Sequence, residues 1–156
     1  MLVDSVYALT REEGEMTDER PPPYQARVRA HQTDLNGAMH HAAFLDLFDD
    51  ARIETYRLFG YDYEWMQTTG LRPVIRRIDC EYFTPAFMDD LLTVSVSVPQ
   101  ITRATMTIRY QCRRDDELLA IGHAVFVFVD ERGKPARVPQ EMVPLAHGPL
   151  APPPAS

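Results

Sequence analysis

The longest helical pattern in the chain runs from about residue 40 to residue 59. Its apolar positions recur at the spacing of one helix face. They are Phe44, Leu45, Phe48, Ala51, Thr55, Tyr56 and Phe59. Charged residues occupy much of the remaining surface, and Gly60 supplies a C-terminal stop. About five turns with this much aromatic bulk predict a helix that other elements wrap around.

Alternation of apolar and polar residues predicts five strands. They cover residues 24–33, 74–83, 92–98, 104–112 and 117–129. The first four alternate strictly, which is typical of strands with one buried face. The last is apolar on both faces, so it is predicted to be central, with Gly122 as a candidate bulge. One strand, a long helix and four further antiparallel strands together predict an α+β domain.

Both ends of the chain have the composition of tails. Residues 1–23 are rich in charge and end in three consecutive prolines, which cannot form a helix or a central strand. Residues 144–156 hold five prolines and no periodic apolar pattern. We therefore predict flexible tails over 1–23 and 144–156, and a folded domain over 24–143.

Composition narrows the function classes. The 156 residues are 45% hydrophobic and 25% charged, as in an ordinary globular domain. The net charge of −7 argues against nucleic-acid binding, which usually needs a basic face. The longest apolar run is too short to span a bilayer, and no signal peptide is evident, so we expect a cytoplasmic protein. Cys80 and Cys112 show no metal-ligand or disulfide spacing.

The stretch from Gln32 to His41 carries the candidate chemistry. Asp34 and Gly37 lie just ahead of the predicted helix, where backbone N–H groups lack partners and the helix dipole is positive. A carboxylate beside such donors suits acyl transfer, which needs a base or nucleophile and an oxyanion donor. The simpler interpretation is that Asp34 forms a cap or an Asx-turn and that Gly37 relieves a tight turn. The local sequence alone favours this simpler interpretation.

Further residues extend the motif along the chain. The motif begins in the loop and at the helix start with Asp34, Gly37, His41 and Phe44. On the predicted helix and at its end it continues with Phe48, Ala51, Arg52, Glu54 and Gly60. The later positions are Tyr82, Pro85, Ala86, Asp89 and Asp90, followed by Gly133, Lys134, Pro135 and Pro139. In this spacing, which covers about residues 27–141, the chain resembles the 4-hydroxybenzoyl-CoA thioesterase-like (YbgC-type) acyl-CoA thioesterases. Two positions depart from the family pattern: Gln32 replaces an acid, and His40 replaces a tyrosine or tryptophan.

The resemblance implies the hot dog fold, in which a five-stranded antiparallel sheet wraps around one long central helix. It also implies hydrolysis of an acyl thioester without a metal or other cofactor, with Asp34 as general base or nucleophile and the backbone N–H of His41 as oxyanion donor. The implied substrate-binding residues are Gly37, His40, Phe44 and Tyr82. The acyl carrier would be coenzyme A or an acyl carrier protein. Family members usually form dimers with each site at the subunit interface, and dimers often pair again into a homotetramer.

Two other functions on the same fold stay open. A dehydratase or hydratase would pair the His41 side chain with Asp50 or Glu54 on the helix. A non-catalytic protein would bind an acyl thioester as a sensor or scaffold, and the two changed motif positions keep that alternative open. If Asp34 is not the hydrolytic carboxylate, the alternative candidates are Asp49, Asp50 and Glu54.

Overall fold

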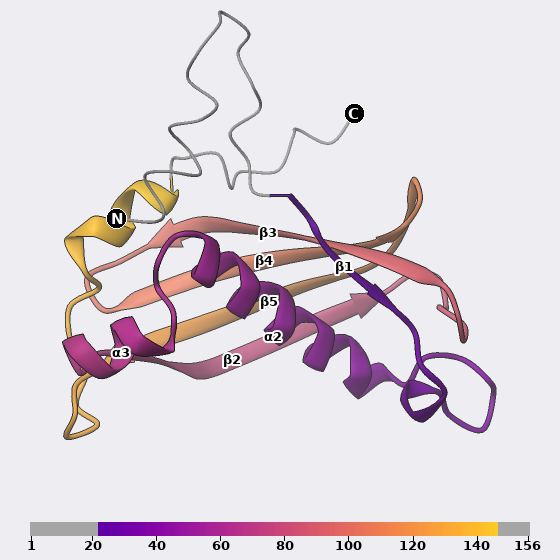
Figure 1. The fold of residues 1–156 in the computed structure, drawn as a ribbon, viewed down its shortest axis with the longest axis horizontal. Coiled ribbons are helices and arrows are strands. Elements are labelled where there is room, and N and C mark those ends of the chain that lie inside the picture. Colours follow the sequence, from indigo (N-terminus) through magenta and orange to yellow (C-terminus); the bar gives the residue numbers. More distant parts are fainter. Residues whose placement is uncertain (1–21, 147–156) are drawn as a thin grey trace, which may run out of the picture.

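The structure is a computed structural model that describes residues 22–146. Most of the two predicted tails, 1–23 and 144–156, therefore lies outside the described residues. The elements are β1 (Tyr24–Arg27), the 3-10 helix η1 (Ala30–Gln32), α2 (His41–Leu58), α3 (Tyr63–Thr69), β2 (Arg72–Tyr82), β3 (Leu91–Ile101), β4 (Thr105–Arg114), β5 (Glu117–Val129) and the 3-10 helix η2 (Gln140–Ala146) (Figure 1). Over residues 22–146, no helix combines the length and apolar character needed to cross a membrane.

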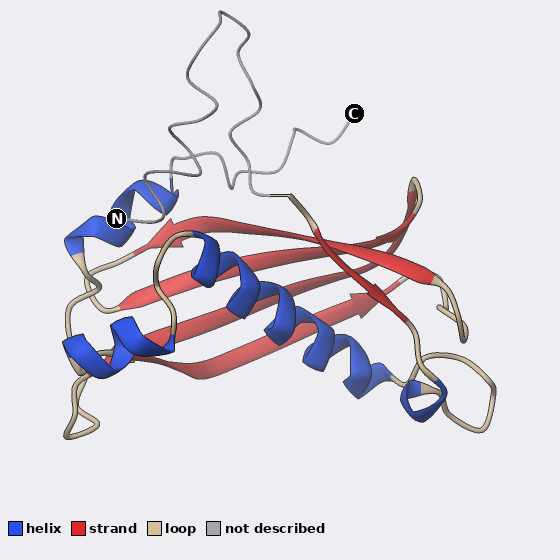
Figure 2. Cartoon of the chain, in the orientation of Figure 1, coloured by secondary structure: helices blue, strands red, loops and turns tan. Residues whose placement is uncertain are grey.

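The five strands form one antiparallel sheet in the order β1-β3-β4-β5-β2. The long helix α2 lies across one face of this sheet, and α3 lies beyond its C-terminal end (Figures 1 and 2). A sheet that wraps one long helix is the hot dog arrangement, so the predicted α+β fold is confirmed. The last four predicted strands are confirmed to within a few residues.

The first predicted strand, 24–33, is wrong in its second half. Strand β1 stops at Arg27, and the chain then forms η1. Local bonds between side chains and backbone close this turn: the Gln32 side chain accepts from the Arg29 N–H at 2.8 Å, and the Thr33 hydroxyl donates to the Ala30 carbonyl at 2.7 Å. Polar side chains of this kind compete with strand pairing for the backbone hydrogen-bonding groups, and here the local bonds form instead of a longer strand.

One face of α2 is buried against the sheet. Its buried residues are Ala43, Phe44, Leu47, Phe48, Ala51, Arg52, Thr55 and Tyr56. The Phe48 ring stacks on the ring of Tyr110 in β4, with centroids 4.9 Å apart. The predicted stripe is therefore largely confirmed, but Leu45 and Phe59 are only half-buried, and the charged Arg52 takes a place in the buried face.

Gly122 is not a bulge. It pairs in register with Tyr110 of β4 and with Cys80 of β2. A Cβ atom at this position would lie 2.5 Å from Cε2 of Phe48, which is closer than real Cβ contacts. The glycine is needed because the helix carries a phenylalanine ring directly onto the backbone of β5, an interior strand that lies between β4 and β2.

We expect Gly122→Ala to lower the free energy of unfolding by about 1–3 kcal/mol, because the added methyl overfills a packed core. The measurement is chemical denaturation of the variant and wild type. The same substitution in a Phe48→Leu background is the control, since the smaller side chain leaves room for the methyl. An equal penalty in both backgrounds would show that the contact with Phe48 is not the cause.

Candidate active site

The predicted loop is a tight turn that leads into α2. The Asp34 N–H donates to the Ala38 carbonyl at 2.9 Å, and the Gly37 N–H donates to the Asp34 carbonyl at 3.0 Å. Gly37 has a φ of 75°, a left-handed conformation that favours glycine. The Asn36 N–H donates to Oδ1 of Asp34 at 2.8 Å. This is the Asx-turn of the simpler interpretation. It orients the carboxylate and leaves Oδ2 without a partner among the described residues.

Most backbone N–H groups at the start of α2 are already bonded. The His40 N–H donates to the Gln32 carbonyl at 2.7 Å, and the Ala43 N–H donates to the His40 carbonyl at 2.9 Å. The Ala42 N–H donates to Nδ1 of His40 at 3.1 Å. The His41 N–H is different, because it has no acceptor within residues 22–146. It is the amide that the sequence predicts as oxyanion donor.

Four predicted site residues come together around this amide. The Tyr82 hydroxyl donates to the His41 carbonyl at 3.0 Å, and the Tyr82 ring meets the Phe44 ring edge-on, with centroids 5.3 Å apart. The His40 and His41 rings stack at 4.3 Å. Burial, with a further contribution from Cys80, raises the pKa of Tyr82 to about 12. The phenol therefore stays a protonated donor at neutral pH and holds the first peptide of the helix.

Asp34 and Gly37 are not bonded to that cluster. Within the described part of the chain, the Asp34 carboxylate forms no hydrogen bond or ion pair with His41 or Tyr82. A bridge between Thr33 and Met39 joins the turn to the helix start, so the two parts are neighbours along the fold. Asp34 is exposed on the surface of the chain.

The alternative carboxylates on α2 are largely engaged. Asp49 pairs with Arg52 at 2.5 Å, and Glu54 pairs with Arg57 at 2.7 Å. Burial and the nearby Asp49, Asp46 and Glu54 raise the pKa of Asp50. Asp50 lies nine residues beyond His41, roughly 14 Å along the helix. Within one subunit, none of the three is placed to act with the His41 amide.

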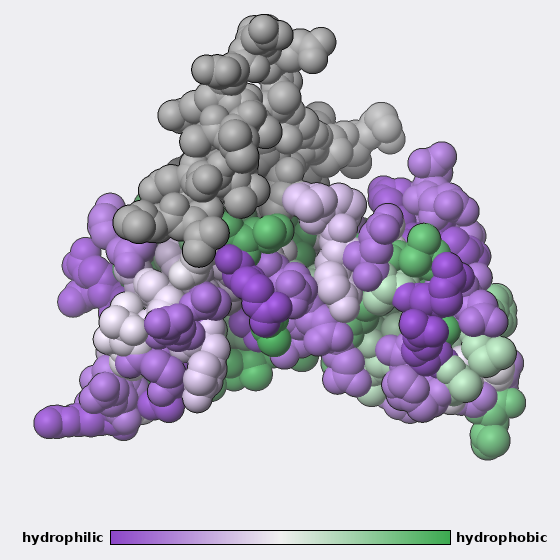
Figure 3. Space-filling view, viewed as in Figure 1, coloured by the Kyte–Doolittle hydropathy of each residue, from purple (hydrophilic) through white to green (hydrophobic). Residues whose placement is uncertain are grey.

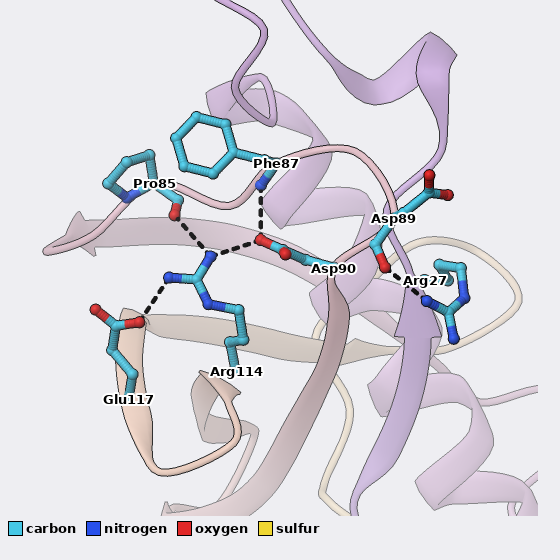
Figure 4. A network of polar contacts seen from close by, with 7 residues as sticks. All are labelled: Arg27, Pro85, Phe87, Asp89, Asp90, Arg114 and Glu117. Atoms are coloured by element: carbon cyan, nitrogen blue, oxygen red, sulfur yellow. Dashed lines mark hydrogen bonds and ion pairs between the residues drawn. The ribbon is translucent and has the colours of Figure 1, made fainter.

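A network around Arg114 holds the turn between β2 and β3 (Figure 4). Its guanidinium donates to Oδ2 of Asp90 at 2.5 Å and to Oε2 of Glu117 at 2.6 Å. Oδ2 of Asp90 also accepts from the Phe87 N–H at 2.8 Å. The sequence gives no signal for this role, because Arg114 is one of many arginines near strand ends and Asp90 lies 24 residues away, in the connection between β2 and β3.

This turn supports the start of the helix directly. The Ala86 carbonyl accepts from the Met39 N–H at 2.7 Å, and Ala38 forms a bridge with Phe87. Both Ala38 and Met39 lie between the Asp34 turn and the helix cap at His40. The Arg114 network therefore fixes the backbone against which the candidate site is built.

We expect Asp90→Asn to flatten the acid dependence of stability. Burial alone would raise the pKa of Asp90, but the Phe87 N–H and the Arg114 guanidinium overcome that effect and lower it. The folded-state pKa therefore lies below the unfolded value, which is about 3.9 for an ordinary aspartate. The stabilisation is present above that value and is lost as pH falls through the folded-state pKa.

Denaturation midpoints between pH 2 and pH 7 measure this effect. Asp116→Asn is the matched control, because the Asp116 carboxylate has no partner among the described residues. The wild type and the control should lose stability below about pH 4 more steeply than Asp90→Asn. Equal slopes in all three proteins would contradict the assignment.

A cavity of about 390 Å³ opens between α2 and the N-terminal half of β2. Apolar side chains line most of it: Leu45, Phe48, Pro73, Ile75, Ile78, Tyr110 and Phe126. Its polar wall includes Arg52, which is only 8% exposed and whose guanidinium lies 4.6 Å from the centroid of the Phe126 ring. The sequence motif includes Arg52, but the sequence does not reveal its burial or the cavity.

Large apolar side chains are also exposed at the end of the molecule that carries the Asp34 turn (Figure 3, lower right). They are Leu35, Tyr82, Phe83, Phe87, Met88 and Leu91. Leu35, at the tip of the turn, is fully exposed. Apolar groups gathered on a surface indicate an interaction site. No cluster of three or more metal-ligating side chains occurs within residues 22–146.

Comparison with known proteins places this geometry in a family. The model of the thioesterase-like superfamily matches residues 28–144. The acyl-CoA thioesterase YbgC of Haemophilus influenzae is 27% identical over 126 residues, which are 80% of this chain and 93% of that protein. A hypothetical protein from Aquifex aeolicus has a crystal structure that superposes with a TM-score of 0.75 at 31% identity, over 81% of this chain and 99% of the other.

A probable thioesterase from Bartonella henselae is similar as well. Its crystal structure superposes with a TM-score of 0.71 at 27% identity, over 74% of this chain and 97% of that one. These matches extend over nearly the whole length of each relative. They agree with the resemblance carried by the sequence motifs, and the chain belongs to the thioesterase-like superfamily.

Proposed function

We propose that this protein hydrolyses an acyl-CoA thioester to a free acid and a thiol. The observation that carries the proposal is the unbonded N–H of His41 at the start of a long, well-packed helix, beside a loop that presents the Asp34 carboxylate. The His41 N–H would bind the carbonyl oxygen as negative charge develops on it, and an oxyanion donor of this kind contributes roughly 10²–10³ in rate.

Asp34 supplies the second part of the chemistry, by either of two routes. As a general base, it takes a proton from water while the water oxygen bonds to the carbonyl carbon; the C–S bond then breaks and the sulfur receives a proton. As a nucleophile, its own oxygen bonds to the carbon, the thiolate leaves, and water hydrolyses the resulting anhydride. Both routes use the Oδ2 atom, since Oδ1 accepts the Asn36 N–H.

We propose further that two copies pair along β2. This strand is at the end of the sheet order, so one of its edges carries no partner strand among the described residues. Val74 and Ile75 near that edge are half exposed. An uncovered edge of eleven residues is a template for pairing, and a symmetric antiparallel pair would extend both sheets into one. Pairing of such dimers into a homotetramer would cover further apolar surface.

This pairing would complete the site. The end of β2 lies at the helix start, because Tyr82 bonds to His41, whereas the cavity lies at the beginning of β2, beside Pro73 and Ile75. In an antiparallel pair, the end of one strand lies beside the beginning of the other. The loop and amide of one copy would therefore face the cavity of the other copy, and that cavity would receive the acyl group.

We favour coenzyme A over an acyl carrier protein as the carrier. The chain has a net charge of −7, which disfavours an acidic carrier protein. The YbgC relative from Haemophilus influenzae is named as an acyl-CoA thioesterase, which supports the same choice. The dehydratase alternative receives less support, because Glu54 is paired with Arg57 and Asp50 lies well along the helix from His41.

The test is release of free thiol from a panel of aliphatic and aromatic acyl-CoAs, run beside the same acyl groups on an acyl carrier protein. Turnover of the CoA esters supports the proposal. Turnover of the carrier-protein esters alone would show that the carrier is an acyl carrier protein and not coenzyme A. Tight binding of acyl-CoA without thiol release would favour the sensor or scaffold function instead.

A further inference from the structure

The cap of α2 is an unusual one. The side chain of His40 accepts a hydrogen bond from the Ala42 N–H through Nδ1 at 3.1 Å, while its backbone is extended, with φ −62° and ψ 139°. Serine, threonine, asparagine and aspartate are the favoured caps, and their oxygens accept at neutral and mildly acidic pH alike. An imidazole nitrogen accepts only while it carries no proton. This cap therefore depends on the protonation state of its own side chain.

The cap also decides which amide is available to a substrate. The Ala43 N–H is bonded to the His40 carbonyl and the Ala42 N–H to the imidazole, which leaves the His41 N–H open. The His40 ring stacks on the His41 ring as well, with centroids 4.3 Å apart. Through these two contacts, the His40 side chain acts together with the backbone bonds of His40 and with the Tyr82 hydroxyl to hold the first helical turn and the His41 N–H within it.

We propose that His40 is a positioning residue that makes the oxyanion donor depend on pH. With neutral His40, the cap is formed and the His41 N–H is held in place. With protonated His40, Nδ1–H and the Ala42 N–H are two donors that face each other, so this bond is lost and the His41 N–H is held less firmly. The inference rests on the proposed thioester hydrolysis. It states that activity falls when the His40 imidazole takes up a proton.

Other titratable groups surround the cap. The His41 ring stacks on the His40 ring, and Asp34 belongs to the preceding turn. His31 lies in η1, and the last residue of η1 accepts a hydrogen bond from the His40 N–H. The Tyr82 hydroxyl reaches the His41 carbonyl from β2. None of these other side chains accepts from the Ala42 N–H, so none of them can replace the cap.

The first test is the pH dependence of kcat for thiol release by the wild type, His40→Asn and His41→Asn. Asparagine caps through an oxygen that does not titrate in this range. The wild type should lose roughly tenfold per pH unit below the midpoint of its acid limb, as one protonation requires. His40→Asn should move that limb to lower pH, where protonation of the Asp34 carboxylate limits the rate, and His41→Asn should retain the wild-type limb. An unchanged limb in His40→Asn would overturn the inference.

The second test does not depend on activity. In protein labelled with ¹⁵N-alanine, the Ala42 amide resonance should shift with pH at the midpoint of the acid limb in the wild type and should not titrate there in His40→Asn. A resonance that is insensitive to pH in the wild type would overturn the inference even if the enzyme is active. Absence of thiol release by the wild type, despite a titrating Ala42 amide, would instead remove the proposed function and with it the catalytic role of the cap.

Discussion

Replacing Asp34 by asparagine should lower kcat for thioester hydrolysis by roughly 10³-fold without unfolding the protein. Asparagine keeps a side-chain oxygen that can accept from the Asn36 N–H, so the turn that now depends on Oδ1 is retained. It neither takes up a proton from water nor attacks a carbonyl carbon. The measurement is thiol release at saturating acyl-CoA, with thermal unfolding of both proteins as the check on folding.

The control for this substitution is Asp116→Asn, which removes an exposed carboxylate between β4 and β5 and leaves the Asp34 turn untouched. It should change kcat by no more than a few fold, unlike Asp34→Asn. Undiminished turnover by Asp34→Asn would exclude this carboxylate as base and nucleophile. Attention would then move to Asp49, Asp50 and Glu54, which in a dimer could face the amide of the other copy.

A mixed dimer should recover the activity that two inactive variants lack. One subunit carries Asp34→Asn with an intact cavity, and the other carries Leu45→Trp, which fills the cavity but keeps Asp34. If the loop of one copy works with the cavity of the other, the mixed dimer holds one intact site, since Asp34 of the second subunit faces the open cavity of the first. We expect about half of the wild-type kcat per dimer, because a two-fold dimer has two equivalent sites.

Mixed dimers can be isolated by co-expressing the two subunits with different affinity tags and purifying on both. Each homodimer should stay far below the wild type, and a mixed dimer of Asp34→Asn with the wild-type subunit should also keep about half of the activity. If the loop worked with the cavity of its own subunit, the mixed dimer of the two variants would have no intact site. Activity no higher than that of the homodimers would therefore refute the shared site.

Much of the fold can be predicted from periodicity. The helix is confirmed over 41–58 because its apolar spacing is long and regular, and four strands are confirmed because their alternation is clear. The failures are local. The strand that begins at Tyr24 is cut short by side-chain bonds of Gln32 and Thr33, which a hydrophobic pattern does not register. Gly122 looks like a bulge until the position of Phe48 is known.

The site is harder to predict, for a different reason. Nothing in the local sequence connects Tyr82 with His41, since they lie 41 residues apart and meet only in the folded chain. The motif resemblance supplies that connection. The cap made by His40 cannot be predicted from the residue type, because histidine is not a favoured cap. The roles of Asp34 and of the His41 amide stay predictions, since no hydrogen bond joins the carboxylate to the cluster among the described residues.

The contact between Phe48 and Gly122 also limits how this sequence can diverge. The two residues share a single volume, so a larger residue at 122 is tolerated only after the ring at 48 has become smaller. Because the intermediate with the smaller ring leaves a cavity and the reverse order creates a clash, both single steps are unfavourable. The pair should therefore vary together among descendants of this chain, and each lineage should keep one of the two compatible combinations.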